Sequence, residues 1–200
     1  MKIIGLTSDT HIPTKCKELP PQVVSVFSSV DLILHAGDVV LPETLQQLKN
    51  LAPVVAVAGN HDRKKNRFPQ PLPNKEIVSV EGYSIGLVHG DSITGNHPYI
   101  WERAYWAFEQ NPVDIIIFGH THNPMVLTDG RTLLINPGSL GCSRYFSQRS
   151  FAKLVLDQDG IGVELFFFEP GNEKISFNYT VNFQPGKLPL TVNQNRKPYW

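Results

Sequence analysis

Short apolar runs alternate with segments of helical periodicity in the first sixty residues, and this alternation restricts the possible folds more than any other feature. The runs are "KIIGLTS", "DLILHAG" and "PVVAVAG", and the segments between them are "PPQVVSVFSSV" and "PETLQQLKN". The runs are too continuously apolar to have a face in water, as expected of a parallel sheet covered by helices. We therefore predict a βαβαβ arrangement in which Pro42 lies in the first turn of the second helix.

The chain from residue 75 to residue 169 has the pattern of hairpins around one further helix. Strand pairs are predicted over "EIVSVEGYSIGLVHG", "PMVLTDGRTLLIN" and "FAKLVLDQDGIGVELFFFE", and the last two contain Asp-Gly turns. An aromatic helix, "YIWERAYWAFEQ", and a strand, "DIIIFG", lie between the first two pairs. Parallel units followed by hairpins predict an α/β fold, a four-layer αββα sandwich with two mixed β-sheets.

Length and composition favour one domain followed by an extension. Residues 1–169 are predicted to form the domain, and residues 170–200 are rich in Asn, Pro and Lys with one strand-like piece, "ISFNYTVNF". We expect this extension to pack on the domain or to pair with a second copy in a homo-oligomer. Lys+Arg and Asp+Glu both number 18, so the net charge gives no signal for nucleic acid. The chain has no membrane span or secretory signal, so we expect a cytoplasmic protein.

Polar residues with metal-ligand chemistry follow five of the apolar runs. They are Asp9 and His11 in "SDTH", Asp38 in "AGD", Asn60 and His61 in "AGNHD", His89 in "VHGD", and His120 and His122 in "GHTH". Taken singly, each segment has a plain interpretation as a cap, a turn or a hydrogen-bonded histidine. "GHTH" is the strongest single piece, because side chains two positions apart share one side of an extended segment. Ligands collect at the carboxyl ends of strands in open α/β sheets, so all five segments are predicted to converge.

The mixture of carboxylate, imidazole and amide groups indicates the kind of ion. Such ligands favour manganese, iron, cobalt, nickel or zinc over the all-oxygen cage of calcium or the thiolate sites of structural zinc. The ligands, seven if His61 is set aside, are too many for one tetrahedral site and suit two ions that share a bridge. Asp38 is a natural bridge because a carboxylate offers two oxygens. We expect two divalent ions, with manganese preferred among the five metals.

The order of these motifs resembles that of the calcineurin-like metallophosphoesterase superfamily. The elements are Asp-x-His, Gly-Asp, Gly-Asn-His-Asp, His and Gly-His-x-His over roughly residues 1 to 169, and the length resembles the small single-domain phosphodiesterases of bacteria and archaea. The resemblance implies the αββα fold and two metal sites. One site would use Asp9, His11, Asp38 and His122, and the other Asp38, Asn60, His89 and His120. It further implies that His61 is catalytic and faces the substrate, as a proton donor to the leaving group or a stabiliser of the phosphoryl oxygens.

Such a site predicts an enzyme, a dinuclear phosphoesterase and more narrowly a phosphodiesterase. A hydroxide that bridges the two divalent ions would attack phosphorus in a small phosphate-ester or nucleotide substrate, so no nucleophilic serine or cysteine is needed. One alternative is a non-catalytic protein-interaction scaffold on the same fold, against which the complete ligand set argues. A metal-dependent amidohydrolase is a second alternative, but that fold is a barrel of typically ~250 residues and this chain is shorter.

Several other polar and aromatic residues carry weaker expectations. Asp62 is a candidate to orient His61, since "GDVVLPE" lacks the family's usual acidic residue and arginine after Gly-Asp, and Asp91 has no assigned role. His35 is predicted to pack beside the site. The segment "INPGS" with Arg144 and Arg149 is either functional or a simple turn. The basic residues Arg63, Lys64, Lys65 and Arg67 form a solvated loop or a phosphate-attracting rim. The aromatic residues Trp101, Tyr105, Trp106 and Phe108 are predicted to be core rather than a base-stacking platform.

Overall fold

The computed structural model describes residues 1–65, 67–91, 97–141, 148–158, 160–172, 174–184 and 187–194. One sheet contains β1 (Lys2–Thr7), β2 (Leu32–His35), β3 (Val54–Ala56), β9 (Arg149–Asp157), β10 (Gly160–Phe168), β11 (Ile175–Gln184) and β12 (Lys187–Gln194). The other contains β4 (Lys75–Val80), β5 (Tyr83–Val88), β6 (Ile115–Ile117), β7 (Met125–Thr128) and β8 (Leu133–Asn136). The helices are α1 (Pro21–Phe27), α2 (Pro42–Lys49), α3 (Asn60–Lys65) and α4 (Ile100–Trp106).

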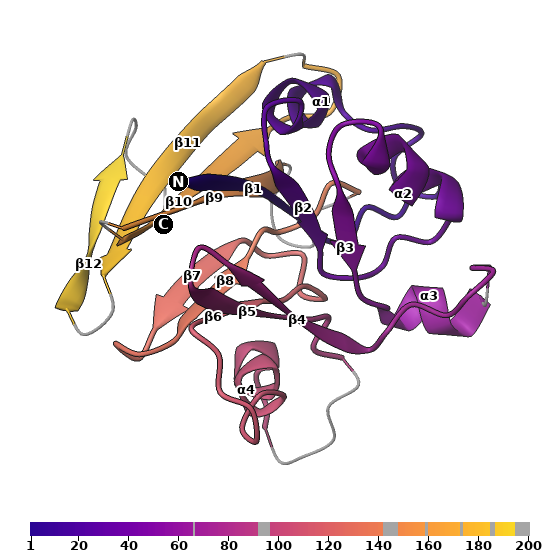
Figure 1. The fold of residues 1–200 in the computed structure, drawn as a ribbon. Coiled ribbons are helices and arrows are strands. Elements are labelled where there is room, and N and C mark those ends of the chain that lie inside the picture. Colours follow the sequence, from indigo (N-terminus) through magenta and orange to yellow (C-terminus); the bar gives the residue numbers. More distant parts are fainter. Residues whose placement is uncertain are drawn as a thin grey trace.

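Both sheets are mixed, as predicted (Figure 1). The order of the first is β12-β11-β10-β9-β1-β2-β3, with β1, β2 and β3 parallel, and the order of the second is β4-β5-β6-β8-β7, with β5, β6 and β8 parallel. Thr7 at the end of β1 pairs with His35, and His35 pairs with Ala56 at the end of β3. The carboxyl ends of these strands therefore lie at one edge of the sheet.

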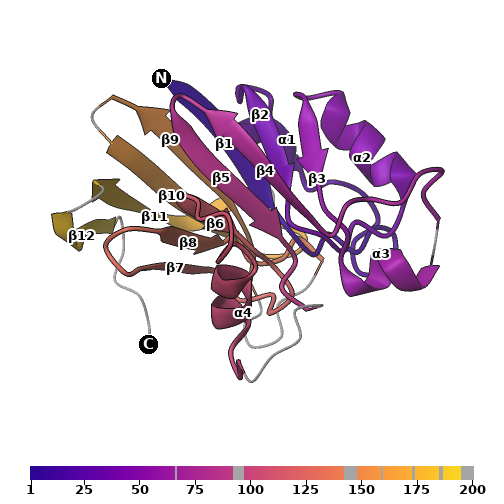
Figure 2. The ribbon, with the colours of Figure 1, turned by 60° about the horizontal axis from the view of Figure 1, so that its bottom comes forward.

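The layers follow the predicted αββα order (Figure 2). Fully buried aliphatic residues such as Leu6, Leu34 and Ile117 fill the space between the sheets. On the outer side of the larger sheet, α1 and α2 contribute Val23, Phe27, Leu45 and Leu48, and on the outer side of the smaller sheet α4 contributes Ala104. A Cβ at Gly5 of β1 would lie 2.8 Å from the Phe27 ring, so glycine permits this close contact between helix and sheet.

The helices and hairpins predicted from the sequence are present. One further strand, β12, was not predicted. Residues 175–184 form β11, which pairs with β10, and β12 then pairs with β11 at the sheet edge. The run of β12 contains Pro189, which argues against a strand except at an edge. The domain boundary at residue 170 stays a prediction. In the described ranges, none of the helices has the length and apolar character that crossing a membrane requires.

The prediction that the aromatic residues of α4 and of the turn after it are core is wrong for two of them. Phe108 is buried at 2% exposure, but Trp101 and Trp106 are 36% and 41% exposed. The core-facing side of this short helix is taken by Ala104, with Ile100 and Tyr105 packed beside it. A seven-residue helix has too narrow an inner face for all its large rings.

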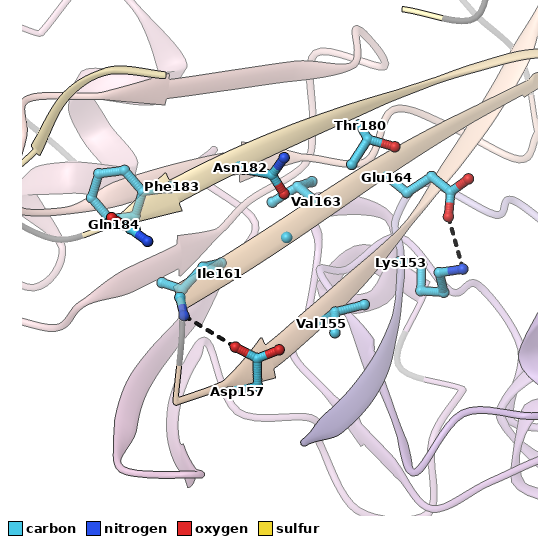
Figure 3. Close-up of a pocket in the computed structure, with 12 residues that line it drawn as sticks. Lys153, Val155, Asp157, Ile161, Val163, Glu164, Thr180, Asn182, Phe183 and Gln184 are labelled. Carbon is cyan, nitrogen blue, oxygen red and sulfur yellow. Dashed lines mark hydrogen bonds and ion pairs between the residues drawn. The ribbon is translucent and has the colours of Figure 1, made fainter. Parts of the chain in front are cut away.

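A groove of about 420 Å³ lies on the outer face of β9, β10 and β11 (Figure 3). Its lining includes Lys153, Asp157, Glu164 and Asn182. β9 runs antiparallel to β1, and Lys2 pairs with Leu156. The groove therefore lies at the end of the sheet where β1 begins, opposite the end where the predicted metal ligands follow the strands.

Candidate metal centre

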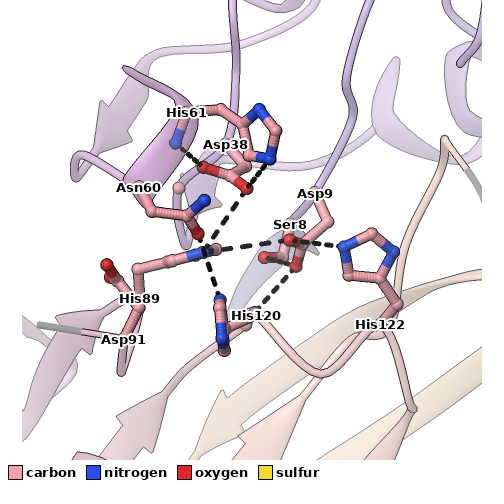
Figure 4. A network of polar contacts seen from close by, with 12 residues as sticks. Ser8, Asp9, Asp38, Asn60, His61, His89, Asp91, His120 and His122 are labelled. Atoms are coloured by element: carbon pink, nitrogen blue, oxygen red, sulfur yellow. Dashed lines mark hydrogen bonds and ion pairs between the residues drawn. The ribbon is translucent and has the colours of Figure 1, made fainter. Parts of the chain in front are cut away.

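The predicted site residues converge where five strands end (Figure 4). Asp9 and His11 follow β1, Asp38 follows β2, Asn60 and His61 begin α3 after β3, His89 follows β5, and His120 and His122 follow β6. Three of these strands belong to the larger sheet and two to the smaller. The site is therefore built across both sheets at their shared carboxyl edge, where ligands collect in α/β folds.

The two oxygens of the Asp9 carboxylate have different surroundings. Oδ2 accepts hydrogen bonds from the Ser8 hydroxyl at 2.6 Å and from the backbone N–H of His120 at 3.0 Å. Oδ1 lies 3.1 Å from His122 Nε2 and 3.8 Å from His11 Nε2, and those two nitrogens are 3.4 Å apart. One oxygen thus fixes the carboxylate, and the other faces a pair of imidazole nitrogens as a ligand would.

Asp38 is arranged in the same way. Its Oδ1 accepts a hydrogen bond from the backbone N–H of His61 at 2.8 Å. Its Oδ2 lies 3.5 Å from His11 Nε2 and 3.6 Å from His89 Nε2. The free oxygen of Asp38 therefore lies between imidazoles from β1 and β5, as expected of a ligand that two ions share.

His89 provides the sharpest evidence that the site receives an ion. Its Nδ1–H donates to the carbonyl oxygen of Ala36 at 2.7 Å, which fixes the ring orientation and the tautomer. Its Nε2 is buried with no hydrogen-bond partner, as is Asp9 Oδ1. A buried polar atom without a partner costs roughly 1–3 kcal/mol. A bound cation would remove that cost, and metal-ligating histidines are commonly oriented by such a carbonyl.

His120 and His122 face different neighbours. His120 Nδ1 is 3.1 Å from Asn60 Oδ1, and its ring lies edge-on to the His89 ring at 5.1 Å, whereas His122 is directed at Asp9. The segment is not extended, because the φ angles of the two histidines are +68° and +59°. The expectation that both side chains share one side of an extended segment is therefore wrong. The left-handed backbone separates them.

Left-handed backbone marks most of the candidate ligands. Among the described residues other than glycine, seven have positive φ, and five of those are Asp9, His11, Asp38, His120 and His122. Such conformations cost of order 1–3 kcal/mol each and cluster at functional sites. A Cβ at Gly119 would meet Ser8 Oγ and Asp9 Oδ2, which explains why glycine precedes the first histidine of "GHTH".

Burial and charge set the protonation of the cluster. Burial raises the pKa of Asp38, and the nearby charge of Asp9 acts in the same direction. For Asp9, burial alone would raise the pKa, but the charge of His89 and the contact with His122 together hold it below its usual value. Burial lowers the pKa of His11 to about 4, so its imidazole is neutral at pH 7, the form that binds metal.

His61 occupies the open side of the cluster. Its Nε2 is 4.0 Å from Asp38 Oδ2, and its side chain is 45% exposed, against 5% for His11 and 2% for Asp38. Its ring meets the His11 ring edge-on at 4.8 Å. His61 is therefore near the candidate ligands and accessible to a substrate.

Asp62 does not orient His61. Its carboxylate accepts hydrogen bonds from the backbone N–H groups of Val40 at 2.7 Å, Gly59 at 2.9 Å and Val39 at 3.2 Å. It therefore ties α3 to the loop that carries Asp38. The sequence interpretation failed here because backbone donors from another loop satisfy the carboxylate more completely than a neighbouring ring would.

The "INPGS" loop supports the site from behind. The Asn136 side-chain amide donates to the Gly119 carbonyl at 3.0 Å, and the Ser139 hydroxyl donates to the Asp9 carbonyl at 2.7 Å. Arg149 instead contacts Cys16 Sγ at 3.2 Å. The predicted partner Arg144 lies outside the described residues. The loop is thus more than a turn, because it holds two of the ligand-bearing segments.

His35 packs beside the site as predicted. It is fully buried, its Nδ1 accepts a hydrogen bond from the Gly37 N–H at 3.2 Å, and its Nε2 lies 3.2 Å from Thr10 Oγ1. Burial lowers its pKa to about 4. Both ring nitrogens are engaged, so His35 has no nitrogen left for a metal.

The fold and donor set agree with what known proteins show. A model of the calcineurin-like phosphoesterase superfamily domain matches residues 1–159. The chain belongs to this superfamily. Its members bind divalent metals, and the described residues include three groups of His and Asp whose ligand atoms lie within 4.8 Å of one another. They are Asp9, His11 and His122; His11, Asp38 and His61; and Asp9, Asp38 and His89.

Two archaeal proteins and one solved structure are similar to this chain. A probable metallophosphoesterase of Methanocaldococcus jannaschii is 42% identical over 137 residues, covering 68% of this chain and 67% of the relative. One from Methanothermobacter thermautotrophicus is 38% identical over 137 residues, covering 68% and 76%. Vps29 of Entamoeba histolytica, solved in complex with zinc, has the same fold with a TM-score of 0.73, 24% identity and coverage of 91% and 99%.

Proposed function

We propose that this protein hydrolyses phosphodiesters with two divalent metal ions. The observation that carries the proposal is the buried, unpartnered Nε2 of His89 beside the free oxygens of Asp9 and Asp38. These three atoms follow three different strands, and His89 Nε2 lies 3.9 Å from Asp9 Oδ1 and 3.6 Å from Asp38 Oδ2. A site that existed only to bind another protein would have no reason to bear this cost.

The contacts support a division of the ligands into two sites that share Asp38. The first site would use Asp9, His11, Asp38 and His122, and the second Asp38, Asn60, His89 and His120. Bound divalent ions supply Lewis acidity and make a hydroxide available at neutral pH for attack on phosphorus. The mixed donors suit manganese, iron, cobalt, nickel and zinc, of which we propose manganese, and the zinc complex of the similar Vps29 makes zinc the first alternative.

His61 would donate a proton to the oxygen that leaves phosphorus. Its exposure lets it reach a substrate, and its position 4.0 Å from Asp38 Oδ2 keeps it next to the reaction centre. The backbone N–H of His61 is held by the other oxygen of Asp38, so the ring is carried on a fixed backbone. General acid help of this kind is worth ~10²- to 10⁴-fold when the leaving group is a poor one.

The test is a matched set of hydrolysis assays on metal-free protein reconstituted with manganese, nickel, cobalt, zinc or magnesium. The substrates are bis(4-nitrophenyl) phosphate, 4-nitrophenyl phosphate and a panel of nucleotides. We expect activity on the diester that exceeds activity on the monoester and requires added metal. Equal or greater activity on the monoester would overturn the assignment as a phosphodiesterase.

The second candidate function is a protein-interaction scaffold, which the fold similarity to Vps29 favours. Absence of hydrolysis with all five metals, combined with tight binding of a protein partner, would select it. Three finer points are proposals as well: a small phosphate-ester or nucleotide substrate, a cytoplasmic location, and assembly with a second copy through residues 170–200.

A further inference from the structure

The first four residues of helix α3, Asn60 to Arg63, have side chains with different partners. Asn60 and His61 face the candidate metal centre, and Asp62 bonds to the loop that carries Asp38. Arg63 is not part of the proposed chemistry. Its Nη1 donates to the carbonyl of Ala58 at 2.8 Å, and its Nη2 donates to the carboxylate of Asp91.

The pair formed by Arg63 and Asp91 is largely enclosed. The side chains are 29% and 13% exposed, and Asp91 Oδ1 is buried without a hydrogen-bond partner. A pair of this kind loses its screening by water, so removal of one partner leaves the other charge poorly compensated. The contact therefore holds the two segments at a fixed separation.

These two segments are the ones that carry the proposed second metal site. Asp91 lies two residues after His89, beside it in Figure 4, and Arg63 lies one helical turn after Asn60. His89 follows β5 of the smaller sheet, and Asn60 follows β3 of the larger sheet. The pair thus joins the two sheets beside the place where both residues would meet one ion.

We propose that Arg63 and Asp91 are positioning residues that set the separation between Asn60 and His89, and through it the affinity of the second metal site. The inference rests on the proposed two-metal function. It replaces the interpretation of Arg63 as part of a phosphate-attracting rim, because its guanidinium is already paired with a carboxylate. Lys64, the next residue, is exposed, and for it both the solvated loop and the rim stay open.

The experiment is a titration of metal-free, full-length protein with Mn²⁺, followed by bound-metal analysis and by electron paramagnetic resonance for coupling between adjacent ions. Wild type is expected to bind two ions per chain. Arg63→Ala and Asp91→Ala should each weaken one site by roughly 10- to 100-fold and leave the other unchanged. The double variant should be no worse than either single variant. Lys64→Ala, the control on the same helix with the same charge, should leave both affinities unaltered.

The possible failures are distinguishable. If wild type binds two ions and hydrolyses diesters but Arg63→Ala binds both ions normally, or loses both equally, the positioning role is wrong and the function stands. If wild type binds two ions but hydrolyses no phosphate ester, the proposed function fails, and the change in one affinity still supports the positioning role. Fewer than two ions bound by wild type would overturn both.

Discussion

Charged and polar side chains lie at both ends of the larger sheet, but they differ in burial and in hydrogen bonding. At the groove, Lys153 and Glu164 form an ion pair at 2.7 Å with side chains 28% and 21% exposed. Asp157 accepts a hydrogen bond from the Gly160 N–H at 3.1 Å. At the carboxyl edge, the side chains of Asp9 and His89 are at most 1% exposed and each has an atom with no hydrogen-bond partner.

This difference separates ordinary surface polarity from a site under functional constraint. A polar group that is paired and solvent-exposed has little effect on the free energy of folding. A buried polar atom without a partner and a residue in left-handed backbone each lower the stability of the fold. At the carboxyl edge Asp9 carries both costs, His89 has the unpartnered atom, and His11, Asp38, His120 and His122 have the left-handed backbone. A cation would offset them, whereas at the groove Lys153 and Glu164 already neutralise each other.

The largest expected effect comes from Asp38→Asn. The substitution removes the ligand that both ions would share, and metal assistance worth several kcal/mol corresponds to about 10³-fold in kcat/KM. The metal-free variant should nevertheless unfold at the same or a higher temperature than metal-free wild type. The reason is that burial and the charge of Asp9 already disfavour a second carboxylate there. Diester hydrolysis and thermal unfolding with and without Mn²⁺ measure both quantities.

Glu164→Gln at the groove is the matched control for this substitution, since it exchanges the same atoms. It should leave hydrolysis and the manganese-induced shift unchanged. Wild type should gain about 2.7 kcal/mol at a free Mn²⁺ concentration of 100 Kd for one site, and the Asp38 variant should gain less. An equal gain in all three proteins would show that manganese binds elsewhere.

The next largest effect is expected for His61→Gln, and it should depend on the leaving group. Loss of a proton donor should lower kcat by about 10²-fold or more for an alkyl leaving group, because a poor leaving group needs protonation. Hydrolysis of a 4-nitrophenyl diester should fall much less. Bound metal should stay at two ions per chain. Lost metal would mean that His61 is a ligand with His11 and Asp38, with which it also forms a group of suitable geometry.

A smaller effect, on the pH dependence of stability, is expected from His35→Gln. His35 is buried like the candidate ligands but has partners for both ring nitrogens. Its pKa falls from 6.5 to about 4 on folding, so only the unfolded chain takes up a proton between these values. Stability is therefore complete above pH 6.5 and decreases as the pH falls towards 4. In metal-free protein, His35→Gln should reduce that decrease by roughly 1–3 kcal/mol. Urea unfolding from pH 7 to pH 4.5 tests this; parallel curves for the two proteins would contradict it.

The strand pattern of the first half was predictable because its short runs are continuously apolar and are separated by helical segments. β12 was not, since Pro189 resembles a strand breaker and its tolerance depends on the strand being at an edge. The exposure of Trp101 and Trp106 was also not predictable. Helical spacing shows which residues share a face of the helix, but not how much of that face the rest of the protein covers.

The candidate site was predictable as a set of residues but not as a network. Motif order indicates the residues that gather, because parallel strands bring their carboxyl ends together. The role of Ser8, the backbone bonds of Asp62, and the pairing of Arg63 with Asp91 depend on contacts between loops. Arg63 and Asp91 are 28 positions apart. "GNHDR" and "VHGD" contain the two charges, and only the packing of the two sheets makes them partners.

The smallest effect is expected at the groove, where Lys153→Met and Glu164→Gln should each change the free energy of unfolding by less than about 1 kcal/mol. A partly exposed ion pair gains little over hydration, and the Lys153 ammonium also lies 5.5 Å from the centre of the Phe166 ring, so part of its contact survives loss of the carboxylate. A double-mutant cycle by urea unfolding measures the coupling. Both variants should keep wild-type diester hydrolysis and metal affinity. If either variant lost activity by tenfold while remaining folded, the groove would be a functional region in its own right. The distinction between satisfied and unsatisfied polar groups would then no longer identify the site.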